Sequence, residues 1–67
     1  MKRITLKAAR VNAGMTLLQA AARLHVNKAT LSAWENGKKM PRPIYFEAAC
    51  RMYGFSPNEI FLPGDLT

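Results

Sequence analysis

The sequence predicts an all-α fold, a compact five-helix bundle that forms one domain over residues 1–67. Two observations predict it. Helix start and stop signals recur along the chain with apolar residues spaced three and four apart between them. No stretch alternates apolar and polar residues over the length of a strand. A chain this short has a narrow margin of stability, so the helices are expected to pack closely, without linkers.

The first two helices each have a capping residue and an apolar stripe. Thr5 is the expected N-cap of the first helix, and Gly14 ends it, because glycine tolerates the left-handed conformation. Its inward positions are Leu6, Ala9 and Ala13. The second helix begins at Thr16, which forms a capping box with Gln19. Its stripe at helical spacing is Leu17, Ala20, Ala21 and Leu24.

The third helix is expected over residues 28–35. Asn27 is its N-cap, and Asn36-Gly37 ends it. Two residues three apart face inward: Leu31 and Trp34. His25 and Val26 form the short turn that separates this helix from the second. Trp34 is interpreted as a core residue rather than a stacking platform, because of its spacing from Leu31.

Two further helices are expected after a basic loop at residues 38–42. The fourth helix has Pro43 in its first turn and Gly54 at its end. Its inward stripe is Phe46, Ala49, Cys50 and Tyr53. The fifth helix begins with a capping box of Ser56 and Glu59. An apolar run follows the box: Ile60, Phe61 and Leu62.

The charge of the chain is unevenly distributed. The formal net charge is +6, and nine of the ten Lys and Arg residues lie before residue 43, where Glu35 is the single acidic residue. From residue 43 onward there are one Arg and three acidic residues. This asymmetry indicates a face directed toward a polyanion such as nucleic acid. A generic solubilising charge is the alternative interpretation.

Cysteine and histidine content excludes two kinds of stabilising site. Cys50 and His25 are single, so neither a disulfide nor a zinc site is expected. Cys50 is interpreted as an inert core residue, and a lone thiol fits a reducing compartment. The sequence has no apolar run of the length of a membrane span or signal peptide. A soluble, cytoplasmic protein is therefore expected.

The second and third helices meet the requirements of a helix-turn-helix motif. Ala21 is small enough for a crossing helix, and Val26 and Leu31 are apolar residues for the corner. The chain resembles, over about residues 6–61, the Cro/cI-type helix-turn-helix domains, also called the xenobiotic response element family. The resemblance is carried by Gly14-Met15-Thr16, Ala21, Leu24, Val26, residues 27–32, Trp34-Glu35-Asn36-Gly37, Pro41 and Gly54-Phe55-Ser56.

The resemblance implies a lambda-repressor-like fold that binds double-stranded DNA sequence-specifically. The residues expected to read bases are Lys28, Ala29, Ser32 and Ala33. Those expected at the DNA backbone are Arg10, Asn27, Asn36, Lys38, Lys39 and Arg42. The framework of the motif is expected to comprise Ala21, Leu24, Val26, Leu31, Trp34 and Glu35, with Arg10 paired to Glu35. An alternative for the loop is that Lys38 and Lys39 are merely solvated. An alternative for the helix is that Ala29 and Ala33 are plain helix formers.

The resemblance also implies a homodimer on a palindromic operator, with recognition helices about 34 Å apart. Apolar residues near the C-terminus exceed the needs of so small a core, and they are the expected interface: Phe55, Ile60, Phe61, Leu62 and Leu66. No cofactor is expected. The chain is not expected to be an enzyme, because it has no paired carboxylates at helical spacing, no phosphate-binding loop and no nucleophile–base pair.

Three residues depart from the family pattern. His25 replaces a turn glycine. Histidine tolerates positive φ better than most residues, so the turn is expected to form. The alternative is that His25 makes the turn pH-dependent. Leu17 replaces a polar residue, and Ala20 replaces a larger apolar one. Leu17 either fills the space that Ala20 leaves or stays exposed, and exposure would create an apolar patch with Leu18, Ala29 and Ala33.

The sequence leaves three functions open. The leading hypothesis is a phage- or prophage-type transcriptional regulator, most simply a repressor that occludes a promoter. The alternative is a protein-binding modulator, resembling an antirepressor, which docks on a partner regulator through the apolar patch. An antitoxin or a targeting module of a larger complex is a third possibility that the residues do not separate from the first.

Overall fold

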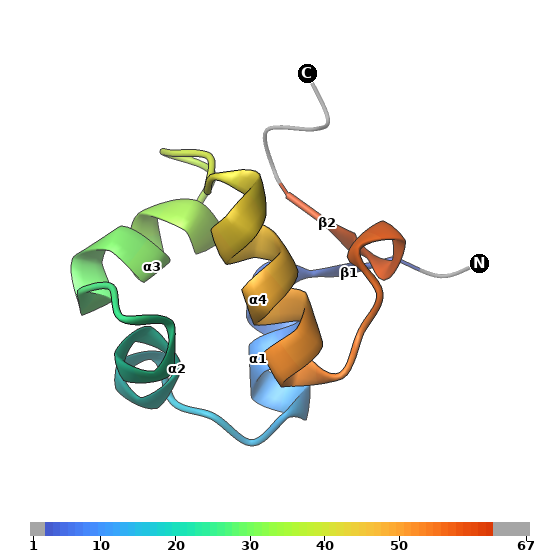
Figure 1. Ribbon diagram of the computed structural model, residues 1–67, viewed down its shortest axis with the longest axis horizontal. Coiled ribbons are helices and arrows are strands. Elements are labelled where there is room, and N and C mark those ends of the chain that lie inside the picture. Colours follow the sequence, from blue (N-terminus) through green and yellow to red (C-terminus); the bar gives the residue numbers. More distant parts are fainter. Residues whose placement is uncertain (1–2, 63–67) are drawn as a thin grey trace.

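The computed structural model describes residues 3–62, which form four α-helices and a two-stranded parallel sheet. The helices are α1 (Leu6–Asn12), α2 (Leu17–Leu24), α3 (Lys28–Glu35) and α4 (Pro43–Tyr53). A 3₁₀ turn, η1 (Pro57–Glu59), leads into strand β2 (Ile60–Phe61), which pairs with β1 (Ile4–Thr5). Figure 1 shows α1 and α4 in the centre, with α2 and α3 on one side and the two strands on the other.

The expected five-helix bundle is therefore wrong at its C-terminal end. The Ser56–Glu59 box does form, since Glu59 Oε1 accepts a hydrogen bond from the Ser56 amide at 2.7 Å, but it closes only one 3₁₀ turn. The chain then becomes extended, and Ile60 pairs with Ile4. This parallel pairing satisfies backbone groups of residues 4–5 and 60–61 and places Ile60 in the core.

The other helices begin and end where their capping residues predict. Thr5 Oγ1 accepts from the Ala8 amide at 3.0 Å, and Thr16 and Gln19 form both hydrogen bonds of a capping box. Gly14 and Gly54 have the positive φ values, +74° and +85°, that end α1 and α4. Within residues 3–62, every helix is too short or too polar to span a lipid bilayer.

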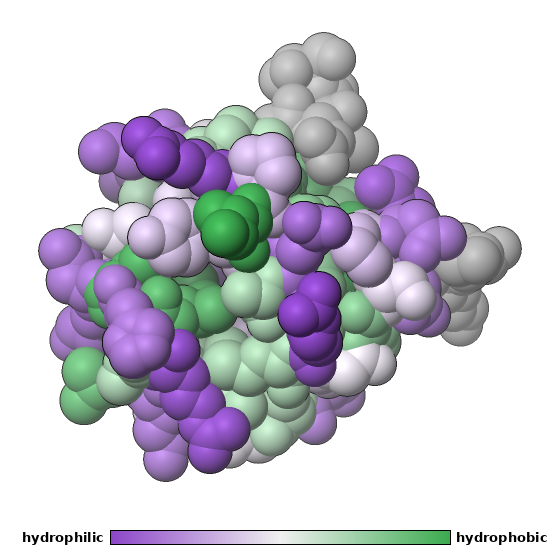
Figure 2. Space-filling model, viewed as in Figure 1, coloured by the Kyte–Doolittle hydropathy of each residue, from purple (hydrophilic) through white to green (hydrophobic). Residues whose placement is uncertain are grey.

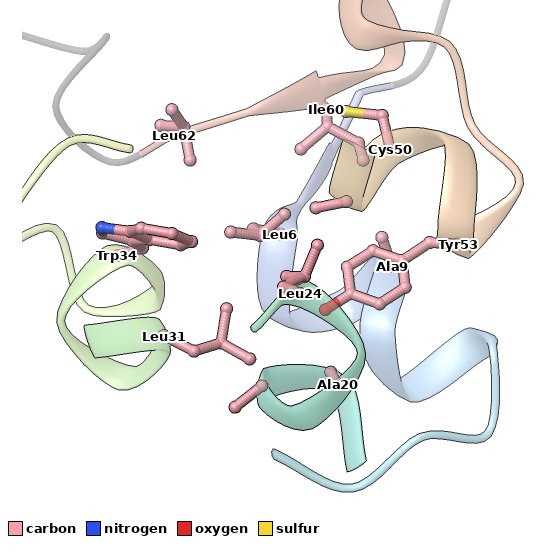
Figure 3. Close-up of a cluster of buried hydrophobic side chains, with 12 residues drawn as sticks. Leu6, Ala9, Ala20, Leu24, Leu31, Trp34, Cys50, Tyr53, Ile60 and Leu62 are labelled. Atoms are coloured by element: carbon pink, nitrogen blue, oxygen red, sulfur yellow. The ribbon is translucent and has the colours of Figure 1, made fainter. Parts of the chain in front are cut away.

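The core lies between the helices and the sheet (Figure 3). Its buried apolar residues are Leu6, Ala9, Ala20, Ala21, Leu24, Leu31, Trp34, Ala49, Cys50, Tyr53, Ile60 and Leu62. Most of the predicted inward positions are confirmed, but Ala13 is exposed because α1 ends at Asn12 and Ala13 is its C-cap. Phe46 is half-buried, and Tyr45 beside it packs its ring against Trp34, with centroids 5.7 Å apart.

Candidate nucleic-acid interface

A tight turn sets the angle between α2 and α3. His25 adopts the left-handed conformation, with φ 59° and ψ 38°. The His25 amide donates to the Ala22 carbonyl at 3.2 Å, and the Val26 amide donates to the Ala21 carbonyl at 3.0 Å. This pair of bonds is a Schellman motif, which ends a helix and satisfies its last carbonyls. Glycine is the usual residue at such a position, and here histidine occupies it.

Small residues let α2 and α3 approach closely. Ala20 and Ala21 are fully buried on α2, and Leu31 of α3 is fully buried as well. Leu24 and Trp34 complete the framework of the motif in the core (Figure 3). Val26, also expected in this framework, is half-buried and packs against the core from the turn.

Leu17 turns inward, as one of the two predicted alternatives requires. It is half-buried and packs against the core, whereas Leu18 is 66% exposed. Ala29 is exposed and Ala33 is half-buried. The apolar patch expected on this face is therefore reduced by one of its two leucines.

The N-terminus of α3 is held by Asn27. Asn27 Oδ1 accepts two hydrogen bonds from Thr30, one from the amide at 2.8 Å and one from the hydroxyl at 2.9 Å. The cap was predicted, but the second bond was not. Thr30 at the third helical position was the available signal, because its hydroxyl lies within reach of a capping side chain.

The face of α3 opposite Leu31 and Trp34 is accessible. Helical spacing places the four expected base-reading residues on this face: Lys28, Ala29, Ser32 and Ala33. Lys28 is exposed, and Ser32 is half-buried. Asn36 follows α3 as its C-cap, is exposed, and donates from Nδ2 to Ser32 Oγ at 3.2 Å.

Arg10 forms the predicted ion pair with Glu35. Its Nε lies 2.8 Å from Glu35 Oε2, one terminal nitrogen lies 3.3 Å from Oε1, and the other donates to the Met15 carbonyl at 2.9 Å. The two side chains are 10% and 5% exposed. The guanidinium is turned into the protein, and the further contact of Arg10 with the DNA backbone stays a prediction.

The Arg10–Glu35 pair determines the surface charge of the N-terminal part of the chain. It uses the one carboxylate of residues 3–42, so all exposed ionised side chains in that stretch are cationic. These are Arg3, Lys7, Arg23, Lys28, Lys38, Lys39 and Arg42. Figure 2 shows hydrophilic residues along the side where α2, α3 and the following loop lie, and others over α4 and near the strands. A polyanion approaching α3 meets no exposed carboxylate from this stretch.

One buried polar atom was not predicted. The Tyr53 hydroxyl is buried and has no hydrogen-bond partner. Burial, assisted by the nearby Glu35 charge, raises the pKa of Tyr53 to about 12. Burial likewise raises the pKa of the Cys50 thiol, and the buried thiol fits the expected inert role.

The expected dimer-interface residues are divided between the core and its edge. Ile60 and Leu62 are buried within the monomer, so their side chains are not free to contact a partner. Two of the apolar residues that predicted an interface therefore belong to the core. Phe55 and Phe61 are half-buried, and the Arg3 guanidinium lies 5.8 Å from the centroid of the Phe61 ring. Leu66 lies outside the described residues.

Comparison with known protein families gives one match, which extends over most of the chain. The family described as "Helix-turn-helix domain" matches residues 3–60, a range that includes all four helices, β1 and the first residue of β2. No curated protein and no solved structure matches the chain significantly. A helix-turn-helix indicates DNA binding, with its second helix in the major groove. The chain belongs to the helix-turn-helix domain family.

Proposed function

We propose that this protein binds double-stranded DNA sequence-specifically, as a Cro/cI-type transcriptional regulator that inserts α3 into the major groove. The observation that carries the proposal is the accessible face of α3 within a surface whose exposed charges, over residues 3–42, are all positive. Lys28 and Ser32 supply hydrogen bonds to base edges, and the methyl groups of Ala29 and Ala33 contact thymine.

The proposed backbone contacts surround this helix. Asn27 lies at its N-terminus and Asn36 at its C-terminus. The exposed loop cations Lys38, Lys39 and Arg42 follow directly. Such contacts fix the register of the protein on the duplex without reading sequence. DNA would then be the ligand, with no catalytic step and no cofactor, in the compartment that holds the DNA.

The motif supports binding in pairs. Each copy has one α3, and the half-sites of a paired operator lie ~34 Å apart, one turn of the duplex. One copy therefore reads one half-site. We propose that two copies bind a palindromic operator with two-fold symmetry and act most simply as a repressor, by occluding a promoter.

Selection from a random duplex pool at physiological salt tests the proposal. We expect enriched duplexes that contain an inverted repeat with half-sites one helical turn apart. Lys28→Glu, an exposed substitution on α3, should abolish the enrichment, and Arg51→Glu on α4 serves as the matched charge control. Failure to enrich any sequence would refute sequence-specific DNA binding, and enrichment of single half-sites would refute the paired arrangement.

The protein-binding modulator remains the second candidate because Leu18 is 66% exposed at the start of α2. An exposed leucine beside a helix-turn-helix face can anchor a partner protein. The inward position of Leu17 weakens this candidate by halving the leucine content of the patch. Leu18→Ser distinguishes the two functions, since it should leave DNA selection unchanged and would abolish binding to a partner regulator.

A further inference from the structure

We propose that the reading face of α3, formed by Lys28, Ala29, Ser32 and Ala33, presents mainly hydrogen-bond donors and methyl groups to DNA, and therefore favours guanine and thymine over adenine and cytosine. The inference rests on the proposed insertion of α3 into the major groove, and it specifies which base edges the helix accepts. The reason is that hydrogen bonds within the protein already occupy side-chain acceptors of Asn27, Ser32 and Glu35.

Asn27 has no acceptor left for DNA. Its Oδ1 accepts from the Thr30 amide at 2.8 Å and from the Thr30 hydroxyl at 2.9 Å. A carboxamide oxygen has two lone pairs, so both are used. The exposed Asn27 side chain can offer only its Nδ2 hydrogens outward. Lys28, the next residue, is also exposed and carries three donors and no acceptor.

Ser32 is oriented as a donor by Asn36. A serine hydroxyl rotates freely and can donate or accept. Here Ser32 Oγ accepts from Asn36 Nδ2 at 3.2 Å, so one of its two lone pairs is occupied and the hydroxyl hydrogen points away from Asn36. A hydroxyl that accepts a hydrogen bond becomes a stronger donor, which favours donation to DNA. Ser32 lies four residues after Lys28 on the same side of α3, and its hydrogen is therefore available to a base acceptor.

Glu35 is withdrawn from the surface. It is the one acidic side chain of α3, and both of its oxygens accept from Arg10, at 2.8 and 3.3 Å. With its side chain 5% exposed, it cannot accept a hydrogen bond from a base. The other residues on the reading face, Ala29 and Ala33, carry only methyl groups.

Base edges in the major groove differ in the polarity that this surface requires. Guanine presents two acceptors, and thymine presents one acceptor and a methyl group, whereas adenine and cytosine each present an amino donor. A donor of the protein that faces an amino group leaves both groups without a partner, which is unfavourable in a desolvated interface. Positions that face Lys28 or Ser32 should therefore prefer the keto bases.

The test selects duplexes with four proteins and compares the base preference at each operator position. The proteins are the wild type, Ser32→Ala, Asn36→Asp and Asn36→Ala. Ser32→Ala identifies the position that Ser32 reads, because the preference there should flatten. At that position the wild type should favour guanine or thymine by about threefold to tenfold, the value of one hydrogen bond. Asn36 is exposed beyond the end of α3, so both of its variants should fold.

The Asn36 variants test the orientation of the hydroxyl. In Asn36→Asp the introduced carboxylate accepts the Ser32 hydrogen and turns the serine lone pairs toward DNA, so the preference should shift to adenine or cytosine, on top of a uniform loss of affinity from the added charge. Asn36→Ala should broaden the preference, with a uniform loss of affinity from the lost backbone contact. A wild-type preference for an amino base at this position, or an unchanged preference in Asn36→Asp, overturns the inference. Failure to select any duplex overturns instead the proposed function beneath it.

Discussion

The Arg10–Glu35 ion pair joins α1, the loop after it and the end of α3 through two buried side chains. Arg10 bonds Glu35 and the Met15 carbonyl at the same time, so its guanidinium is compensated by a charge and by a backbone oxygen. Removing one member of a buried pair leaves the other charge without a partner in a poorly solvated place. The pair therefore fixes the position of α3, and its loss affects folding before it affects any ligand.

Arg10→Met should lower the free energy of unfolding by about 3–5 kcal/mol, the range for breaking a buried ion pair. Urea denaturation followed by the fluorescence of Trp34, the single tryptophan, measures this loss. The exposed Arg51→Met is the matched control and should change stability by no more than about 0.5 kcal/mol. The double variant Arg10→Met/Glu35→Leu should recover part of the loss. If Arg10→Met and Arg51→Met lowered the free energy of unfolding equally, a structural role for the ion pair would be contradicted.

Tyr53 should make the protein sensitive to alkaline pH. Its pKa is about 12 in the folded protein, above the ordinary value of 10.0, because burial disfavours the phenolate. Below pH 10 Tyr53 is neutral in the folded and the unfolded protein, and the free energy of unfolding falls as the pH rises from 10 toward 12, because only the unfolded chain then ionises easily. Tyr53→Phe should remove that loss, and it should stabilise the protein at neutral pH by about 1 kcal/mol, since no unpaired hydroxyl remains buried.

Urea titrations of the wild type and Tyr53→Phe between pH 8 and 12 measure this effect as the difference in unfolding free energy at each pH. Comparison at equal pH cancels the contributions of groups that both proteins share. The difference should grow in favour of the variant above pH 10. A constant difference across this range would show that Tyr53 ionises as easily in the folded protein as in the unfolded chain.

At the scale of elements, the turn between α2 and α3 is the strained part of the motif. His25 is the one non-glycine residue of positive φ in the described part of the chain. A side chain in this conformation costs about 1 kcal/mol of stability relative to glycine. Glycine offsets part of this difference, because it raises the conformational entropy of the unfolded chain. The Schellman hydrogen bonds of Val26 and His25 hold the turn in place despite this cost.

His25→Gly should therefore be at least as stable as the wild type, with a gain of up to about 1 kcal/mol, and His25→Val should lose about 1–2 kcal/mol because a β-branched residue is poorly tolerated at positive φ. Thermal unfolding by circular dichroism gives the order of the three proteins. Lys28→Val, an exposed substitution in the first turn of α3, controls for the introduction of valine. A valine variant at residue 25 as stable as this control would contradict a strained turn.

The elements also show what sequence alone can predict here. The boundaries of α3 were predicted to the residue because its signals, Asn27 and Asn36-Gly37, are local. The pairing of β1 with β2 was missed because each strand has two residues, too few for a periodic pattern, and their partners lie far apart in the chain. The partnership of Arg10 with Glu35 was reached only through the family resemblance, and the Met15 carbonyl that completes it carries no sequence signal. The DNA contacts themselves stay predictions.

At the scale of the whole molecule, we expect the uneven distribution of charge to govern association with DNA. The exposed ionised side chains of residues 3–42 are all cationic, whereas the exposed Glu47 lies on α4, outside that stretch. Contacts with about six phosphates would give a slope near −5 for the logarithm of the binding constant against the logarithm of salt concentration. Such a slope indicates that counterion release supplies much of the affinity.

Replacement of loop cations should reduce this salt dependence. Lys38→Ala and Lys39→Ala should each lower the magnitude of the slope by about 1 and weaken binding to all duplexes equally, because phosphate contacts do not read sequence. Arg51→Ala on α4 is the control and should leave the slope unchanged. Fluorescence anisotropy with the selected duplex between 50 and 300 mM salt measures the slopes. A flat response of the wild type would contradict the proposed phosphate contacts.

The parallel pairing of β1 with β2 also governs how the domain can be joined to other chains. In a parallel pair the chain leads into one strand and leaves the other at opposite ends of the sheet. Figure 1 shows that β1 begins on the side away from α2 and α3 and that both strands run toward the helices. A tag or a fused domain attached before β1 therefore need not cross the helix-turn-helix, and this end of the sheet is the place to choose for such a fusion.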